Sequence, residues 1–348
     1  MNKFVLLYDC PFKKCDKIWV YNGLKKYRMV KVIDIIPKTT YLKLALFLPK
    51  IKIGKVMLRF VVFFQSFRAI ISSNKNDIII VWNYMGGILM NQLLSFFKVK
   101  RKVVSFCWID LPRKKNYKKV KKCLLNNNFI PIINDKRLEK KLVDLFDLET
   151  WNGLFLPDVY DDKEKFLDPI YIEDKNNRYC FAGGLNNRDW DVLIDCAKKL
   201  KEIKFVIVSN RGAIERDDIP ENVQLYEDLE KKEYYKMMKE SFITICPLKE
   251  DRVSGLINII KSIQYGIPCI TTKLEVTSQY YPLKAKSNLL YQQNDIIDLI
   301  NKIKKTWDIT QKDYEKIVNK LQKHIKNEFD PNNNVKKLYS KLKKKKWL

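Results

Sequence analysis

The stretch RYCFAGGLNNRDWDVLIDCAKKLKEIKFVIVSN (178–210) decides the fold class. A short apolar run (178–184) ends in two glycines, a helical pattern follows from about 190 to 201, and a second apolar run closes the stretch at 204–210. Short apolar runs that alternate with helical patterns are typical of βαβ units in a parallel sheet. The alternation continues through NVQLY, FITICPL and PCITT to residue 272, so this half is predicted to form a Rossmann-like domain.

The other half of the chain repeats the same alternation. Its runs are rich in β-branched residues and have helical patterns between them: FVLLY (4–8), MVKVIDII (29–36), DIIIVW (77–82), KVVSFCW (102–108) and FIPIIN (129–134). A chain of 348 residues is also too long for one ordinary core. We therefore predict an α/β fold with two Rossmann-like domains that face each other across a cleft.

The predicted domain boundaries follow changes in composition. The segment 155–177 is acidic and polar and contains two prolines, which favours a connection between domains. We therefore place a first domain at 1–160, a linker at 161–177 and a second domain at 178–310. The Lys-rich tail, 311–348, is predicted to form basic helices that pack back toward the first domain.

The charge of the chain is unusual, with 67 Lys and Arg against 40 Asp and Glu, or +27. Such an excess points to partners that carry phosphate, such as nucleic acid, anionic lipid headgroups or diphosphates. An AT-biased genome, which favours Lys, Asn and Ile codons, could produce the same excess. No zinc spacing, RNP-type strand or basic-region helix is present, so no nucleic-acid partner is expected.

Metal and membrane signals are few. The first apolar run, FVLLY, is short and soon meets Asp9, which indicates a buried strand rather than a signal peptide, and no apolar stretch is long enough to span a membrane. Eight cysteines without zinc spacing and the single histidine, His324, argue against a metal site and a Ser-His-Asp triad. Free thiols suggest a reducing cytoplasm.

The segment 41–71 stands apart because it is strongly apolar but contains Lys52, Lys55, Arg59 and Arg68. It could be a buried helix of the first domain. It could instead be an interfacial patch that inserts apolar side chains while its cations meet anionic headgroups. The second interpretation predicts a peripheral protein at the inner face of the cell membrane.

Three polar, cationic loops follow strands of the second domain, at the sheet edge where α/β folds bind ligands. Glycine allows close backbone approach, arginine can neutralise a phosphate, and the free N–H groups of a helix starting near 255 would hold a diphosphate. The candidate ligand-binding residues in these loops are Gly183, Gly184, Arg188, Asn210, Arg211, Lys249, Ser254 and Gly255.

The order of these elements resembles the donor-binding domain of GT-B glycosyltransferases, in particular the family 4-like group. The resemblance covers about 120 residues, and its motifs are FAGGLNNRDWDVLIDCAKKL (181–200), IPENVQLYEDLEKKEYYKMMKESFITICPLKED (219–251), SGLINIIKSIQYGIPCITT (254–272) and SNLLYQQNDIIDLINKI (287–303). It implies that 178–310 binds a nucleotide sugar and that 1–160 binds the acceptor.

The resemblance also implies roles for single residues. Arg188 would contact the donor diphosphate, with Lys249 or Lys261 as a second cation, while Leu256 and Asn258 lie at the phosphate-binding helix. The nucleobase of the donor would lie against residues 224–228. Cations and a helix N-terminus can stabilise the leaving diphosphate without a metal. Asp189-Trp190-Asp191 looks like a metal-binding Asp-x-Asp motif, but Asp189 is better interpreted as a helix N-cap.

The chain departs from the family at one important pair. The family usually carries two glutamates eight positions apart, and the second accepts hydrogen bonds from the ribose; here the positions are Val253 and Lys261. Lysine cannot accept these bonds. Either Glu250 or Asp251 takes over, or Lys261 faces a phosphate, or the donor site has been lost.

The first domain is expected to supply the acceptor contacts. Asn83, Gly86 and Gly87 follow its third run. A reaction that inverts the anomeric centre would need a carboxylate base, for which Asp110 and Asp9 are the candidates, each of which could also be a cap or turn residue. A retaining reaction, common in the family, needs none.

The sequence thus predicts a metal-independent, retaining-type hexosyltransferase without a cofactor. It would transfer a sugar from a nucleotide-diphosphate sugar to a glycan or lipid-linked glycan in surface polysaccharide or glycoconjugate synthesis. The alternative is a non-catalytic GT-B partner subunit that has lost the donor site. The sequence leaves the oligomeric state open.

Overall fold

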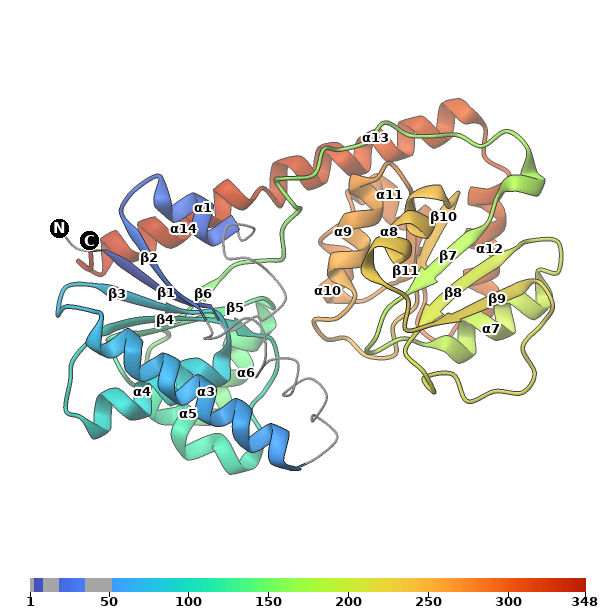
Figure 1. Ribbon diagram of the computed structural model, residues 1–348. Helices are drawn as coiled ribbons and strands as arrows, with labels where there is room; N and C mark the ends of the chain where they lie inside the picture. Colours follow the sequence, from blue (N-terminus) through green and yellow to red (C-terminus); the bar gives the residue numbers. More distant parts are fainter. Residues whose placement is uncertain (1–2, 9–18, 35–51) are drawn as a thin grey trace. The chain divides into compact units, whose positions relative to one another are not determined.

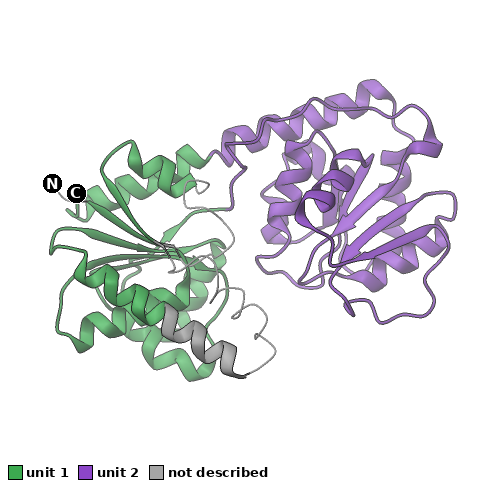
Figure 2. Cartoon of the chain, viewed as in Figure 1, with its two compact units in different colours: residues 1–157, 331–348 green, residues 158–330 purple. Residues whose placement is uncertain are grey.

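The computed structural model describes residues 3–8, 19–34 and 52–348, without the side chains of 52–61. It divides into two compact units (Figure 2): unit 1 is Met1–Pro157 with Pro331–Leu348, and unit 2 is Asp158–Asp330. Each unit contains a six-stranded sheet in which neighbouring strands run parallel. The predicted α/β class with two Rossmann-like halves is confirmed.

The sheet of unit 1 has the order β2-β1-β3-β4-β5-β6. Its strands are β1 (Phe4–Tyr8), β2 (Val30–Asp34), β3 (Ile78–Val81), β4 (Lys102–Trp108), β5 (Phe129–Ile133) and β6 (Leu154–Phe155). Its helices are α1 (Trp19–Lys25), α3 (Lys52–Ile71), α4 (Tyr84–Phe96), α5 (Tyr117–Leu124), α6 (Arg137–Phe146) and α14 (Pro331–Lys344).

Helices cover both faces of this sheet (Figure 1). On one face α3, α4, α5 and α6 pack on alternate strand residues, and α6 buries Leu138, Leu142 and Phe146 at a spacing of four that places them on one side of the helix. On the other face α1 packs beside α14, which buries Val335, Leu338 and Leu342. The chain therefore returns to unit 1 at its end.

The sheet of unit 2 has the order β12-β11-β10-β7-β8-β9. Its strands are β7 (Cys180–Gly183), β8 (Phe205–Ser209), β9 (Val223–Glu227), β10 (Ile243–Cys246), β11 (Cys269–Thr272) and β12 (Leu290–Tyr291). Its helices are α7 (Trp190–Lys199), α8 (Lys231–Glu240), α9 (Leu256–Gln264), α10 (Glu275–Ser278), α11 (Leu283–Leu289), α12 (Ile296–Trp307) and α13 (Gln311–Glu328). The strand order reverses between β7 and β10, which is the point where such sheets bind ligands.

The observed units differ from the predicted domains in two respects. The segment expected as a linker, 161–177, belongs to unit 2, and the tail 311–348 is divided, with α13 in unit 2 and α14 in unit 1. Residues 158–177, called the strap below, are held on α9 because the buried Gln264 amide donates to the carbonyl oxygens of Asp161 (2.8 Å) and Glu164 (2.7 Å). A buried amide needs such partners.

Candidate functional site

Two loops at the carboxyl ends of β7 and β10 are joined into one structure. The Asn187 side chain donates to the Glu250 carbonyl (2.8 Å) and accepts from the Glu250 N–H (3.0 Å). The Lys249 N–H donates to the Asn187 carbonyl (3.2 Å), and Ser254 Oγ donates to the Asn186 carbonyl (3.0 Å). These two loops, which the sequence places at one edge of the sheet, therefore form a single site.

Arg188 lies inside this site with only 7% of its surface exposed. Its Nε donates to the Gly183 carbonyl (3.0 Å) and one terminal nitrogen donates to the Asn186 carbonyl (2.8 Å). A Cβ at Gly184 (φ +142°) would lie 2.2 Å from the guanidinium, and one at Gly255 (φ +75°) would lie 3.0 Å from it. The two glycines are thus needed because the guanidinium packs against the backbone of both loops.

The N-terminus of α9 adds a positive end beside this guanidinium. Gly255 is the N-cap residue, and its left-handed conformation turns the chain into the helix at Leu256. The N–H groups in the first turn of a helix have no acceptor within it, and together with the helix dipole they favour an anion. Arg188 and α9 thus provide a fixed charge and free donors at one place.

Asn258 holds the first loop to α8. Its side-chain amide donates to the Gly183 carbonyl (2.9 Å) and to the Tyr234 hydroxyl (2.7 Å). The Tyr234 ring covers Gly183, where a Cβ would lie 2.5 Å from the ring, and burial raises the pKa of this tyrosine. Tyr234 was not among the predicted site residues, although the adjacent tyrosines in EYYKMM (233–238) were an available signal.

Two of the other predicted cations, Lys249 and Arg211, lie at the surface. Lys249 Nζ is 3.5 Å from an Asp191 oxygen. The Arg211 side chain is 82% exposed and lies 3.8 Å from Glu227, while the N–H of Gly212 donates to the same carboxylate (3.0 Å). The β8 loop with Asn210 and Arg211 is therefore tied to the acidic end of β9 rather than to the Arg188 site.

Lys261 is buried and paired. Its Nζ lies 2.9 Å from Glu164 and 3.3 Å from Asp161, and the Tyr265 hydroxyl donates to Glu164 (2.7 Å). Burial of the Glu164 carboxyl raises its pKa, but the hydrogen bonds from Tyr265 and Lys261 outweigh this effect and the pKa lies below its ordinary value. The structure thus pairs Lys261 with carboxylates of the strap, which sequence analysis had assigned to a linker.

The other acidic candidates have structural partners. Asp251 accepts from the N–H groups of Glu275 (3.3 Å) and Val276 (3.2 Å) and caps α10, and Glu250 lies 3.3 Å from Arg252. Asp189 caps α7 by accepting from the Val192 N–H (3.4 Å), as predicted. No group of three or more His, Cys, Asp or Glu that could hold a metal ion occurs in the described part of the chain.

The candidate acceptor-binding residues of unit 1 cap and position helix α4. Asn83 caps α4 by accepting from the Gly86 N–H (2.5 Å), and a Cβ at Gly87 would lie 2.1 Å from Ser105 Oγ on β4. Both glycines are buried, and because they lack a side chain α4 can pack closely on the sheet. They face the sheet rather than an exposed ligand. Asp110 is exposed after β4 and accepts from the next N–H (2.8 Å), and Asp9 lies outside the described residues.

Unit 1 also exposes large apolar side chains on α3 and the C-terminal end of α4. Phe96 is 79% and Phe64 is 61% exposed, and the rings of Phe67 and Phe97 join the two helices at 5.7 Å. We call this set the aromatic face: Phe63, Phe64, Phe67, Ile71, Phe96 and Phe97. It includes the end of the segment 41–71, of which 41–51 lie outside the described residues. Among the helices that are described, none is both long and apolar enough to cross a membrane.

No protein-family model matches the sequence, and no curated protein matches it. Solved structures do match. A trehalose-6-phosphate structure from E. coli bound with UDP-2-fluoro glucose superposes with a TM-score of 0.70 at 9% identity, over 98% of this chain and 99% of the other. An α,α-trehalose-phosphate synthase (UDP-forming) from Burkholderia xenovorans, in complex with glucose-6-phosphate, gives 0.66 at 10% identity over 99% and 100%.

A third structure matches over a smaller part. The pneumococcal O-GlcNAc transferase GtfA, in complex with UDP and GlcNAc, gives a TM-score of 0.57 at 12% identity, over 82% of this chain and 60% of GtfA. At these identities a match establishes the fold. The sequence resemblance and the structural matches agree that the chain has the fold of GT-B glycosyltransferases.

Proposed function

We propose that the chain is a glycosyltransferase that moves a sugar from a nucleotide-diphosphate sugar to a glycan or lipid-linked glycan acceptor. The observation that carries this proposal is the buried Arg188 guanidinium beside the N-terminus of α9, at the strand-order reversal of unit 2. Both groups are fixed before a ligand arrives, which makes their electrostatic stabilisation effective.

In this proposal the donor diphosphate lies at Gly184, Gly255 and Leu256. Negative charge grows on the diphosphate as the sugar leaves, and the guanidinium with the helix N–H groups stabilises it without a metal. A retaining reaction needs no separate carboxylate base. If the reaction inverts, Asp110 or Asp9 would have to take the acceptor proton.

We further propose that unit 1 meets an anionic acceptor or membrane surface. Unit 1 contains 38 Lys and Arg against 10 Asp and Glu, a net charge of +28, whereas unit 2 contains 29 against 30, a net charge of −1. A codon bias would raise lysine in both units, so it does not account for this difference. Excess cation in one unit is instead expected where that unit has an anionic partner.

The aromatic face favours a lipid surface as this partner. Helix α5 packs against α4, and seven of the ten residues 113–122 at and before α5 are exposed Lys or Arg. Exposed rings can enter the headgroup region while neighbouring cations meet lipid phosphates. This supports a protein that acts at the cytoplasmic face of a membrane on a lipid-linked acceptor in polysaccharide or glycoconjugate synthesis.

One observation favours the alternative, a non-catalytic GT-B partner subunit. The family's ribose-binding glutamate is replaced by Lys261, whose charge is already neutralised by Asp161 and Glu164. A chain without its ribose contact could keep the fold and lose the donor.

Incubation of the purified chain with a panel of nucleotide-diphosphate sugars separates the two functions. UDP-sugars come first because UDP or a UDP-sugar analogue occupies two of the matching structures. The enzyme proposal expects slow donor hydrolysis by the chain alone and a melting temperature that rises with donor concentration. A panel in which no donor is hydrolysed or raises the melting temperature would contradict it and leave the partner-subunit function.

A further inference from the structure

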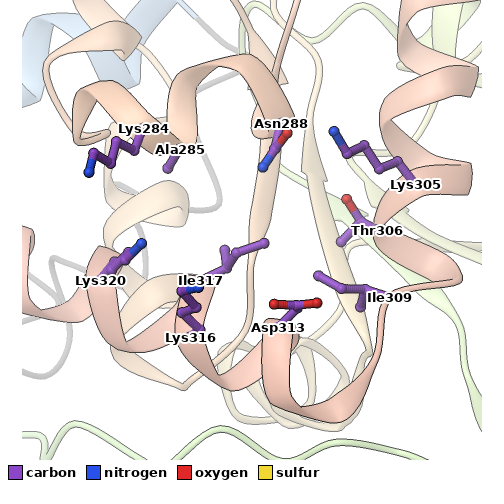
Figure 3. Close-up of a pocket in the computed structure, with 10 residues that line it drawn as sticks. All are labelled: Lys284, Ala285, Asn288, Lys305, Thr306, Ile309, Asp313, Lys316, Ile317 and Lys320. Atoms are coloured by element: carbon purple, nitrogen blue, oxygen red, sulfur yellow. The ribbon is translucent and has the colours of Figure 1, made fainter.

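Unit 2 contains a second cationic site that shares no residue with the Arg188 site. Helices α11, α12 and α13, with the turn between α12 and α13, line a cavity of about 290 Å³ (Figure 3). Four lysines from all three helices line it: Lys284, Lys305, Lys316 and Lys320. Asn288 also lines the cavity, and in Figure 3 its side chain and that of Lys305 extend toward each other.

These four lysines lack the carboxylate partners that some other cations of unit 2 have. Arg216, Lys261 and Lys302 each lie within 4.0 Å of at least one carboxylate. Within the described ranges, no such ion pair is formed by any of the four lysines that line the cavity. The only carboxylate among the lining residues is that of Asp313, which is bonded to the Thr310 hydroxyl (3.2 Å) at the N-terminus of α13.

The floor of the cavity is apolar. Ala285 is buried, and Ile309 and Ile317 pack against the core of unit 2. Like charges repel one another, and the repulsion is stronger beside an apolar surface than in open water. All four lysines are exposed, and they gather cationic charge around one cavity in a unit whose overall charge is close to neutral.

We propose that this cavity binds a small phosphate-bearing anion. The lysines and the Asn288 amide supply donors that fit phosphate oxygens, which accept charge-assisted hydrogen bonds. The volume lies at the lower end of the range of small-molecule sites, so the ligand is a small metabolite rather than a polymer. The apolar floor would contact a carbon skeleton, which distinguishes a phosphate ester from free phosphate.

Helix α13 also links the cavity to the helix that begins at the Arg188 site. Gln322 on α13 donates to the Ile263 carbonyl of α9 (3.2 Å) and to the Leu167 carbonyl of the strap (2.7 Å). The anion would thus bind a helix that is bonded directly to the one whose N-terminus forms the proposed donor site. This proposal does not depend on the proposed transferase activity, because the cavity lies outside the transferase site.

Calorimetric titration of the full chain with pyrophosphate and with glucose 6-phosphate tests the proposal. The double variant Lys305→Gln/Lys320→Gln should weaken one binding event by about 10-fold or more, since each charge-assisted hydrogen bond contributes more than a neutral one. The matched control is Lys304→Gln/Lys323→Gln, which removes the same charge from the same two helices but from residues outside the cavity lining. It should bind as the wild type does.

Two comparisons complete the test. Stronger binding of glucose 6-phosphate than of inorganic phosphate would identify an ester as the ligand class, and equal binding would identify free phosphate. Arg188→Ala, which affects only the donor site, should leave the event at the cavity unchanged. Equal affinities in the pocket variant, the control and the wild type would overturn the proposal, whatever the outcome of the donor-hydrolysis assay.

Discussion

Units 1 and 2 have the same architecture, six parallel strands with helices on both faces, but they differ in where they carry charge. Unit 1 has a net charge of +28, whereas unit 2 has −1. Unit 2 instead builds its proposed donor site from one buried guanidinium and one helix N-terminus. We infer from this comparison that the proposed diphosphate site depends on one placed charge, whereas the proposed partner surface of unit 1 depends on summed charge.

The largest expected effect comes from Arg188→Ala in unit 2. The change removes one of the two side-chain donors to each of the Gly183 and Asn186 carbonyls, leaving those from Asn258 and Ser254, and it removes the fixed charge beside α9. Because loss of one such donor typically costs about 100- to 1,000-fold in rate, kcat/KM for the sugar donor should fall by about that factor.

The matched control is Arg211→Ala, which removes an exposed cation from the neighbouring loop. Steady-state kinetics of this variant should resemble those of the wild type. Equal losses in both variants would mean that summed charge matters in unit 2 as well, and the distinction between the units would fail.

Leu338→Ala and Leu321→Ala test whether the two units unfold independently. Both leucines are fully buried, Leu338 of α14 in the core of unit 1 and Leu321 of α13 in the core of unit 2. Each substitution should destabilise its own unit by about 2–5 kcal/mol through lost burial and a cavity. Differential scanning calorimetry should show two transitions, each lowered by one variant, whereas a single transition lowered equally by both would show that the units unfold together.

Reversal of charge on α5 tests the surface role of unit 1. Lys118→Glu/Lys119→Glu/Lys122→Glu should weaken binding to phosphatidylserine vesicles by more than about 3 kcal/mol, since each cation near an anionic surface is worth about 1 kcal/mol. Vesicle sedimentation measures this.

The charge-matched control is Lys199→Glu/Lys201→Glu/Lys232→Glu in unit 2, at residues that are also exposed. It should keep most of the binding. Wild-type binding should weaken with added salt, because exposed charges are screened. Binding that is insensitive to salt and equal in both triple variants would contradict the surface role.

The smallest expected effect is the pH dependence that Glu164 contributes to unit 2. Its pKa in the folded chain lies below the ordinary value of 4.5, so the carboxylate stabilises the fold above that value and the contribution is lost as pH falls through the folded pKa. Glu164→Gln should therefore flatten the decline of the unit 2 melting temperature below about pH 4.5. Asp162→Asn, a nearby exposed carboxyl, should leave the decline unchanged.

The sequence predicted the elements that depend on local pattern. The runs at 4–8, 102–108 and 178–184 form strands, and Asp189 caps its helix, because alternation of apolar runs and capping chemistry act over a few residues. The GT-B fold also followed from the order of motifs.

What escaped prediction depends on contacts between distant residues. Lys261 pairs with carboxylates 97 and 100 residues earlier in the chain, and the strap that carries them belongs to unit 2. No local pattern reports such pairs. The available signal was that Lys261 is the sole charged residue in the helix LINIIKSIQ, because a buried lysine needs an acidic partner.

Hydrogen–deuterium exchange of the full chain, with and without a nucleotide-diphosphate sugar that it binds, tests the central claim most directly. The account predicts slower exchange at the amides of 184–188 and 254–258, where the guanidinium and the α9 N-terminus would hold the diphosphate. Unchanged exchange at both loops under saturating donor, or protection confined to unit 1, would contradict a donor site in unit 2.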